Sequence, residues 1–265
     1  MGKINHIRLV SLTEPGALAF LDAIPTIPQH AMPSQLFVVA LRRCLGMDLF
    51  PIITKNITCS CGKQISNPHV QTCTTAHEEI KHRHKTTQYL LEHALQRAHL
   101  PVSSEPHTNV GQCRFDIKTN NLDSPIGNLY LDITLTSPFR TEHLHPQTPS
   151  DYQPGQAMAA AANFKHNKYK NHLATKGPNA HFRPVVFTSF GAHDHNATYI
   201  YSKLSYLTKD NLPNNLSWTS RNFYAFQNQA TSCTIHKDTA AAIIHIINKA
   251  LLSASLPELD LSHLS

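Results

Sequence analysis

The chain has 265 residues, of which 41% are hydrophobic and 15% charged, and its formal net charge is +6 at pH 7. This composition provides enough apolar residues for a packed core and argues against a globally disordered chain. The moderate basic excess is compatible with a polyanionic partner such as nucleic acid. We find neither an apolar stretch long enough to cross a membrane nor a secretory signal after Met1, so we expect a protein that is nuclear or otherwise intracellular and not secreted.

The N-terminal region has a helical pattern over residues 8–48, interrupted by a proline-rich break over residues 22–33. Ser34 is suited to cap a second helix, whose apolar residues recur at helical spacing as far as Gly46, a residue typical of helix ends. We therefore expect residues 1–56 to form a helical segment.

Three of the six cysteines lie close together with a histidine, in the pattern C-x-C-x7-H-x3-C formed by Cys59, Cys61, His69 and Cys73. Three thiolates and one imidazole can complete a tetrahedral zinc site, which can hold together a short segment that has no core of its own. His77 is an alternative fourth ligand, and buried free cysteines are the alternative without metal. We expect residues 57–76 to bind structural zinc in a reducing compartment.

Residues 77–99 have the clearest helical pattern, which ends before Pro101. The first residues, H-E-E-I-K-H, are similar to the H-E-x-x-H signature of zinc proteases, but His77 and His82 are five residues apart. At this spacing the two imidazoles point to different faces of a helix and cannot share one metal ion. The spacing therefore argues against a metalloprotease.

The rest of the chain alternates between extended and helical patterns. The extended segments are residues 102–106, 114–118, 129–136 and 182–190, and the helical segments are residues 155–173 and 238–254. Pro184 predicts an edge position for the last strand. Because strands and helices alternate, we expect an α/β fold with a mixed central sheet flanked by helices. Its core would be residues 77–200, followed by a C-terminal helical extension over residues 201–265.

Two of the extended segments flank a turn rich in Asn, Asp and Gly, which predicts a hairpin that carries two aspartates. Alternation places Phe115 and Ile117 on one face and Asp116 on the other, and it places Asp132 opposite the neighbouring leucines. Pairing of the apolar faces brings Asp116 and Asp132 to the same side. Two such carboxylates repel each other unless a cation lies between them, and Mg²⁺ or Mn²⁺ prefers oxygen ligands. Solvent-facing aspartates at a sheet edge are the alternative.

Lysines of the Ala-rich helix and one glutamate extend this candidate catalytic set. Lys165 and Lys168 are three residues apart and share a helix face, with Tyr169 beside them. A fixed positive charge near an activated water would stabilise charge that develops on a phosphate. Glu105, on the preceding strand, is a candidate third carboxylate. A solvated basic helix face is the alternative.

The order of these motifs resembles the C-terminal region of site-specific non-LTR retrotransposon proteins. In those proteins a CCHC-type zinc element precedes a restriction-like endonuclease of the PD-(D/E)XK type. The resemblance covers about residues 57–190. It rests on the Cys/His pattern followed by His77, Lys81-His82-Arg83-His84, Glu105-Pro106, Arg114-Phe115-Asp116-Ile117, Leu131-Asp132-Ile133-Thr134 and Lys165-x-x-Lys168-Tyr169.

The resemblance implies that Asp116 and Asp132 hold a divalent metal and that Lys165 replaces the lysine that ordinary members carry two residues after the second acid, where this chain has Thr134. One departure is Phe115, which stands where that group usually has Pro. Another is the absence of a reverse-transcriptase motif from the sequence. The chain would then be a detached endonuclease piece, a degenerate remnant or a domesticated derivative.

The function implied is a Mg²⁺-dependent DNA endonuclease, with RNA as a second possible partner. Binding through backbone phosphates should weaken steeply with salt. The alternatives are a nucleic-acid-binding module without catalysis and a zinc-stabilised interaction module. The residues expected to contact nucleic acid are Arg83, His84, Arg114, Lys168 and Tyr169, of which the last two could instead support Lys165.

Overall fold

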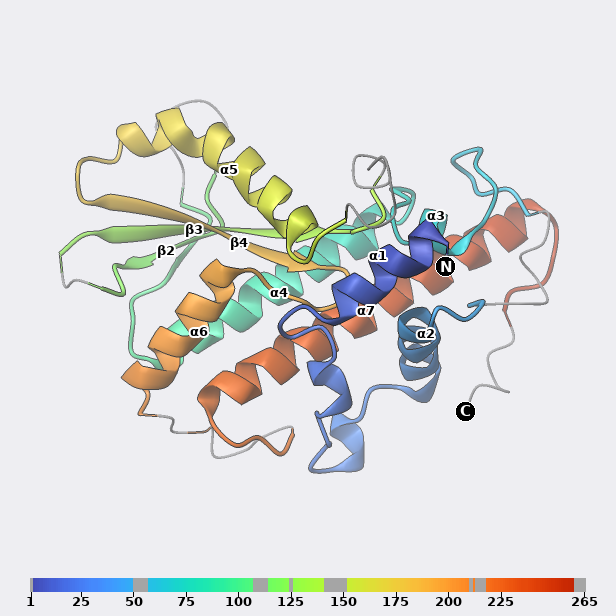
Figure 1. The fold of residues 1–265 in the computed structure, drawn as a ribbon, viewed down its shortest axis with the longest axis horizontal. Helices are drawn as coiled ribbons and strands as arrows, with labels where there is room; N and C mark the ends of the chain where they lie inside the picture. Colours follow the sequence, from blue (N-terminus) through green and yellow to red (C-terminus); the bar gives the residue numbers. More distant parts are fainter. Residues whose placement is uncertain are drawn as a thin grey trace.

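The structure, a computed structural model, describes residues 2–49, 57–106, 114–123, 126–140, 152–209, 212 and 218–259. Figure 1 shows the order and arrangement of the elements. The helices are α1 (Lys3–Leu12), α2 (Ser34–Leu45), α3 (Asn67–Val70), α4 (His77–Arg97), α5 (Gln156–Ala174), α6 (His195–Leu207) and α7 (Phe223–Ser253), with short 3-10 helices at Ala19–Leu21 and Pro28–His30. The strands are β1 (Ser103–Ser104), β2 (Ile117–Asn120), β3 (Asn128–Thr136) and β4 (Ala180–Thr188).

The strands form one mixed sheet in the order β1-β2-β3-β4. β1 and β2 pair antiparallel, as do β2 and β3, whereas β3 and β4 are parallel over their full lengths. The helix α5 makes the crossover that a parallel pair requires. β4 lies at one end of this order, so the edge position expected from Pro184 is confirmed. The expected mixed α/β architecture is confirmed as well.

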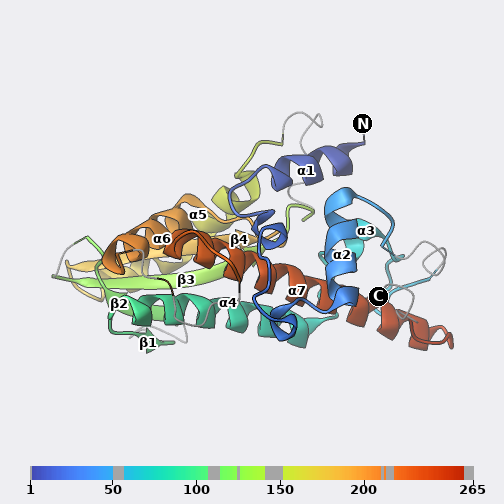
Figure 2. The same cartoon turned by 90° about the horizontal axis from the view of Figure 1, so that it is seen from below.

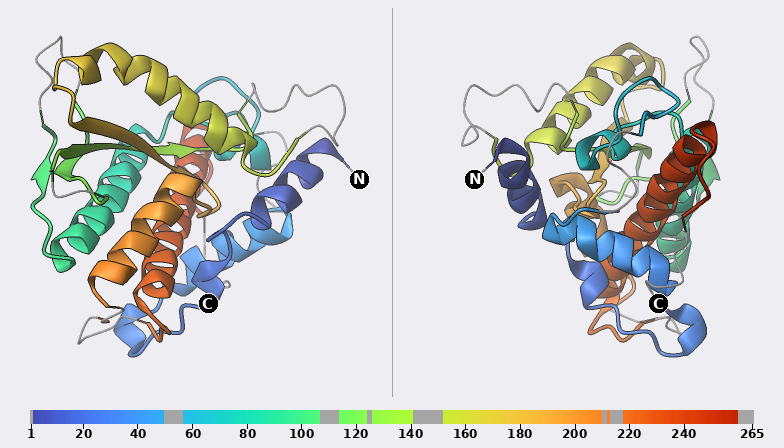
Figure 3. Two further views of the ribbon diagram at one scale, coloured as in Figure 1. Left: turned by 60° about the vertical axis from the view of Figure 1, so that its left-hand side comes forward. Right: turned by 90° about the vertical axis from the view of Figure 1, so that its right-hand side faces the viewer.

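Different helices cover the two faces of the sheet. α5 lies over one face, and α4, α6 and α7 lie over the other (Figure 3). Side chains alternate along β3, so Leu131 and Ile133 join the core shared with α4, α6 and α7. Tyr130 instead packs with Tyr169 beneath α5. Asp132 lies two residues after Tyr130 and therefore shares the α5 face.

α7 connects the sheet to the cysteine-containing element (Figure 2). Its first residue, Phe223, belongs to the core of the sheet, whereas Ile243 packs with the element that carries the cysteines. The apolar pattern of the sequence predicts a helix only over residues 238–254, because polar residues hide the apolar periodicity of the first half of α7. The structure buries several of them, among them Gln227 and Thr231. Neither α7 nor any other helix among the described residues has the length and hydropathy needed to cross a membrane.

The first residue of α2 and the presence of α6 also differ from the expected elements. α2 begins at Ser34, but Pro33 occupies the N-cap position, so Ser34 is the first helical residue and not the cap. Its end at Gly46 agrees with the expectation, since this glycine has a φ of 71°, which glycine adopts at low cost. α6 was not predicted. It begins after Asp194, whose carboxylate accepts a hydrogen bond from the Ala197 N–H at 2.9 Å.

Candidate functional site

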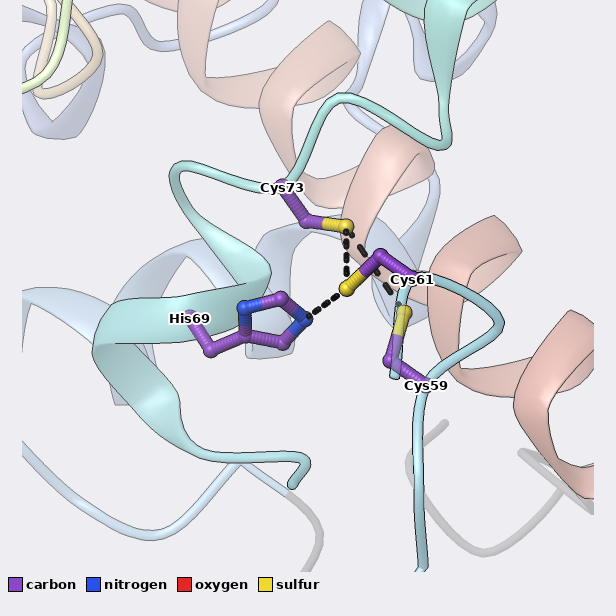
Figure 4. A group of neighbouring side chains, drawn as sticks. All are labelled: Cys59, Cys61, His69 and Cys73. Carbon is purple, nitrogen blue, oxygen red and sulfur yellow. Dashed lines mark hydrogen bonds between the residues drawn. The ribbon is translucent and has the colours of Figure 1, made fainter. Parts of the chain in front are cut away.

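Four side chains with metal-binding atoms meet in the segment of the chain that connects α2 to α4. The Sγ atoms of Cys59, Cys61 and Cys73 and a ring nitrogen of His69 all lie within 4.8 Å of one another (Figure 4). The Sγ atom of Cys73 is 3.6 Å from that of Cys59 and 3.9 Å from that of Cys61, and Nε2 of His69 is 3.4 Å from Sγ of Cys61. A tetrahedral zinc ion with bonds of about 2.3 Å holds its sulfur ligands about 3.8 Å apart. The cluster can therefore bind a metal such as zinc.

Local backbone geometry brings these ligands together. A tight turn after Cys59 is closed by a hydrogen bond from the Gly62 N–H to the Cys59 carbonyl oxygen at 2.8 Å, and Gly62 has a φ of 84°. The Cys73 N–H donates to the His69 carbonyl oxygen at 2.8 Å, which holds the second pair of ligands close. His77, the alternative fourth ligand, is exposed at the start of α4 and does not belong to the cluster.

The surroundings of the cluster favour a thiolate at Cys59. Burial raises the pKa of this thiol, but hydrogen bonds from the Cys61 backbone N–H and from the His69 and Thr75 side chains outweigh burial and lower the pKa to about 6. Burial and the neighbouring Cys59 raise the pKa of Cys73. Cysteines bind metal as thiolates, so a bound cation would stabilise the Cys73 thiolate and oppose this rise in its pKa.

The cysteine-containing element packs against the C-terminal half of α7. The side chains of Ile57, Ile65 and Val70 form one buried cluster with Ile243 and Ile247 of α7. These few apolar side chains are too small a core to fold a segment of this length alone. A bound metal would therefore stabilise both the element and its contact with α7.

The second group of polar side chains lies beneath α5, around the buried Asp132 in β3. Oδ2 of Asp132 lies 2.6 Å from Nζ of Lys165, and the Thr134 hydroxyl donates to the same oxygen at 3.3 Å. The Tyr169 hydroxyl donates to Oδ1 at 2.6 Å. Lys165 and Tyr169 are one helical turn apart on α5, so both reach one carboxylate.

Asp116, just before β2, reaches the same region from the edge of β3. Its N–H donates to the Leu131 carbonyl oxygen at 3.0 Å, and its Oδ2 accepts a hydrogen bond from the Ile133 N–H at 2.6 Å. The carboxylate thus takes the place of a main-chain carbonyl in the antiparallel ladder. Nε2 of His84, on α4, lies 3.3 Å from the same Oδ2 and 3.0 Å from the Ile133 carbonyl oxygen.

The backbone around Asp116 differs from the regular strand that alternation assumes. Phe115 and Ile117 were expected on one face, but they lie on opposite faces. Ile117 belongs to the core on the α4 side, whereas Phe115 stacks on Tyr169 beneath α5. The backbone bends at Asp116, and β2 begins only at Ile117. Alternation holds only within a regular strand, so it could not predict the face of Phe115.

The two acids interact electrostatically. Burial and then the charge of Asp116 raise the pKa of Asp132, while the Lys165 ammonium and the Tyr169 hydroxyl lower it. The hydrogen bond to Asp116 raises the pKa of His84 against the effect of burial, and the charges of both aspartates act in the same direction. The pKa values of Asp132 and His84 therefore both depend on the charge of Asp116.

Glu105 does not join the two aspartates, contrary to the expectation. Its carboxylate oxygens lie 2.6 Å from Nζ of Lys85 and 3.4 Å from Nη1 of Arg114. These basic groups draw the side chain to an exposed ion pair beside α4. The backbone of Glu105 has a φ of 49°, and its N–H donates to the Asp116 carbonyl oxygen at 2.7 Å. Glu105 thus supports the main chain of Asp116 and not a metal ion.

The residues expected to contact nucleic acid occupy different environments. Lys168 is exposed on α5, and Arg114 has a side chain that is 54% exposed. Tyr169 is buried, so it can hold Asp132 but does not present its ring to a partner. Nη1 of Arg83 donates to Oγ1 of Thr239 in α7 at 2.9 Å, which directs this side chain into the protein.

Gln88, on α4, is a member of the site that the sequence analysis did not include. Its Nε2 donates to the Asp116 carbonyl oxygen at 3.1 Å and to Oε1 of Glu92 at 2.7 Å. His84 and Gln88 are four residues apart and therefore lie on the same helix face. Polar residues at this spacing beside a buried helix face are the signal that could have identified Gln88.

No protein-family model and no curated protein matches this chain. Its function must be inferred from the two groups of side chains, the Cys/His cluster beside α7 and the acidic group around Asp132 beneath α5.

Proposed function

We propose that the chain is a metal-dependent DNA endonuclease with a restriction-endonuclease-like core, which hydrolyses backbone phosphodiesters. The observation that carries the proposal is the approach of Asp116, Asp132 and Lys165 from two neighbouring strand segments and the crossover helix. The order of α4, three antiparallel strands, α5 and a parallel β4 agrees with the PD-(D/E)XK resemblance of the motifs. Two carboxylates for a cation and an ammonium group for a phosphate suit phosphoryl transfer.

The oxygen atoms near Asp116 suit a divalent cation. Oδ2 of Asp116 and the Ile133 carbonyl oxygen both lie within 3.3 Å of Nε2 of His84, so they already converge on one positively polarised group. Asp132 adds a second carboxylate, whose pKa burial and Asp116 raise. Mg²⁺ or Mn²⁺ prefers such oxygen ligands, and Asp116 and Asp132 would hold it. When bound, the ion would activate water and neutralise charge on the phosphate.

The chain's own residues would then hold and orient the reacting groups. Lys165 has a side chain that is only 18% exposed, so its charge acts at short range on a phosphate next to Asp132. Tyr169 fixes the orientation of the Asp132 carboxylate through the opposite oxygen. During hydrolysis a water oxygen forms a bond to phosphorus and releases a proton to the surrounding water. The bond from phosphorus to a sugar oxygen breaks, its electron pair leaves with that oxygen, and the oxygen takes up a proton from the same water. His84 would help to orient the Asp116 carboxylate, since its Nε2 lies 3.3 Å from Oδ2 of Asp116.

Exposed basic residues around this group would bind the DNA backbone. Lys81 and Lys168 are exposed on α4 and α5, and Arg114 lies between them in the chain near Asp116. Contacts of this kind bind phosphate and carry little sequence information, so affinity should fall with salt concentration. The resemblance to retrotransposon endonucleases favours DNA over RNA as the substrate.

The test is nicking of supercoiled plasmid DNA by the purified 265-residue chain in the presence of Mg²⁺. We expect Asp132→Asn to lower the nicking rate by at least about 10²-fold, the size of effect seen when one charge-stabilising group is removed from an active site. Asp123→Asn is a matched control, because Asp123 is an exposed aspartate paired with Lys203 at 2.9 Å in the turn between β2 and β3. It should leave the rate unchanged.

Equal nicking by wild type and Asp132→Asn would refute the catalytic assignment. Salt-sensitive DNA binding without nicking by the wild type would instead support a non-catalytic nucleic-acid-binding module. That alternative has one specific observation in its favour, since both oxygens of Asp132 are already bonded to side chains of the protein.

A further inference from the structure

Two arginine side chains enter the protein near the carboxyl ends of β3 and β4. Arg43, in the last turn of α2, is only 3% exposed. Its Nη2 donates to the carbonyl oxygen of Ser189, the first residue after β4, and its guanidinium carbon lies 4.5 Å from the centre of the Phe190 ring. Arg83, on α4, bonds Thr239 on α7 at 2.9 Å.

One face of α7 contacts the surroundings of both arginines. Nε2 of His236 lies 2.8 Å from the Phe190 carbonyl oxygen, beside Arg43, and Thr239 is three residues further along the helix. Residues three apart share a helix face, so the two guanidinium groups lie along the same side of α7. Burial lowers the pKa of Arg43 to about 10, and the positive charge of Arg83 contributes to this shift.

Several donors of this arginine pair have no hydrogen-bond partner among the described residues. They are Nε and Nη1 of Arg43 and Nε of Arg83. The buried Oγ of Ser189 likewise bonds to none of the described residues. Buried charged groups are normally paired, because an unpaired one loses its hydration without compensation. Among the residues that the structure describes, Asp238 acts on Arg83, whereas the charges that act on Arg43 include no carboxylate. The described groups of this region therefore have more positive than negative charge.

We propose that Arg43 and Arg83 form a binding site for a phosphate group at the carboxyl ends of β3 and β4. Phosphate oxygens match the planar set of guanidinium donors better than a single carbonyl does. The carboxyl ends of parallel strands are also a common place for ligands in α/β folds. Arg140, shortly after β3, is exposed, and its charge acts on Arg83, so positive potential extends from Arg43 and Arg83 to the surface.

The source of the phosphate is either a free anion or a nucleic-acid backbone, and only the second rests on the proposed nuclease function. The first arm of the test measures the thermal unfolding midpoint of the full chain in sodium phosphate and in sodium chloride of equal ionic strength. We expect phosphate at tenfold above its Kd to raise the midpoint of the wild type by about 3 °C. Arg43→Met should remove this rise.

Arg42→Met is the matched control, since Arg42 lies in the same turn of α2 but donates to the Leu49 carbonyl oxygen at 3.3 Å. It removes the same charge and should keep the phosphate response. No response in the wild type, or an equal response in Arg43→Met, overturns the proposal. If near-ultraviolet circular dichroism shows that Arg43→Met does not fold, Arg83→Met takes its place in the same comparison.

The second arm measures DNA affinity against salt concentration. A DNA phosphate at this site predicts that Arg43→Met lowers the slope of log K against log salt by about 0.9, the effect of one phosphate contact. A lost phosphate response with an unchanged slope supports the site and identifies free phosphate as its ligand. Asp132→Asn should keep the phosphate response whether or not the chain nicks DNA, so failure of the nuclease proposal and failure of this one are distinguishable.

Discussion

Replacement of Tyr169 by Phe would remove one hydroxyl group and leave the packing of the ring unchanged. The ring stacks on Phe115 with centroids 4.7 Å apart. The hydroxyl oxygen lies 2.6 Å from Oδ1 of Asp132 and 2.7 Å from the Arg114 carbonyl oxygen. It has one proton, so the main loss is one hydrogen bond to a buried carboxylate. We expect Tyr169→Phe to lower the free energy of unfolding by about 2 kcal/mol, within the range for hydrogen bonds to charged groups.

Urea unfolding followed by circular dichroism measures this loss as a lower midpoint with an unchanged slope. The thermal midpoint should fall by roughly 4–8 °C. Tyr130→Phe is the control, because Tyr130 packs in the same ring cluster while its hydroxyl bonds to none of the described residues. This variant should stay within about 0.5 kcal/mol of the wild type. Equal losses in the two variants would refute the idea that the Tyr169 hydroxyl specifically holds Asp132.

Two further predictions concern the Cys/His cluster and a buried glutamate. Cys73→Ala should abolish stoichiometric zinc in the purified protein, which metal analysis measures. Cys44→Ala is the control, because Cys44 is a buried cysteine outside the cluster, and this variant should keep the zinc. Zinc retained in Cys73→Ala would contradict the site. Burial raises the pKa of Glu14 from 4.5 to about 7. Between these two pH values the folded chain keeps a proton that the unfolded chain releases. The free energy of unfolding should therefore fall by about 3 kcal/mol as the pH rises from 4.5 through 7. Urea unfolding at several pH values measures this fall. Glu14→Gln should remove the pH dependence, whereas Glu78→Gln, at an exposed glutamate, should keep it. A pH dependence that persists in Glu14→Gln would show that another group causes it.

Features contained within one element could be predicted from the sequence. The four candidate zinc ligands fall within fifteen residues, so short turns suffice to gather them. The spacing of Lys165 and Tyr169 places both on one face of α5, and the structure has both side chains on Asp132. In these cases the period of the helix or the length of a turn leaves few alternative geometries.

Contacts between distant elements could not be predicted in the same way. Glu105 was placed with the aspartates because it precedes them in the chain, but Lys85 on α4 pairs with it instead. Arg43 lies within the helix that was expected after Ser34, but its partner Ser189 is 146 positions away, so the helical pattern gives no sign of this contact. Periodicity describes one element at a time, so it contains no information on which polar groups a neighbouring element will supply.

Asp116 acts electrostatically on Asp132 although its backbone differs from the regular strand that alternation assumes. If β2 continued regularly through this residue, the Ile133 N–H would bond a main-chain carbonyl and the Asp116 carboxylate would lose that donor. The bend lets the side chain accept this hydrogen bond and face His84 at the same time. Bonds from Gln88 and from the Glu105 N–H to the Asp116 carbonyl oxygen compensate for the interrupted ladder. Departures from local rules that are compensated in this way occur mainly at functional positions, which supports treating Asp116 as part of a site and not as an ordinary strand residue.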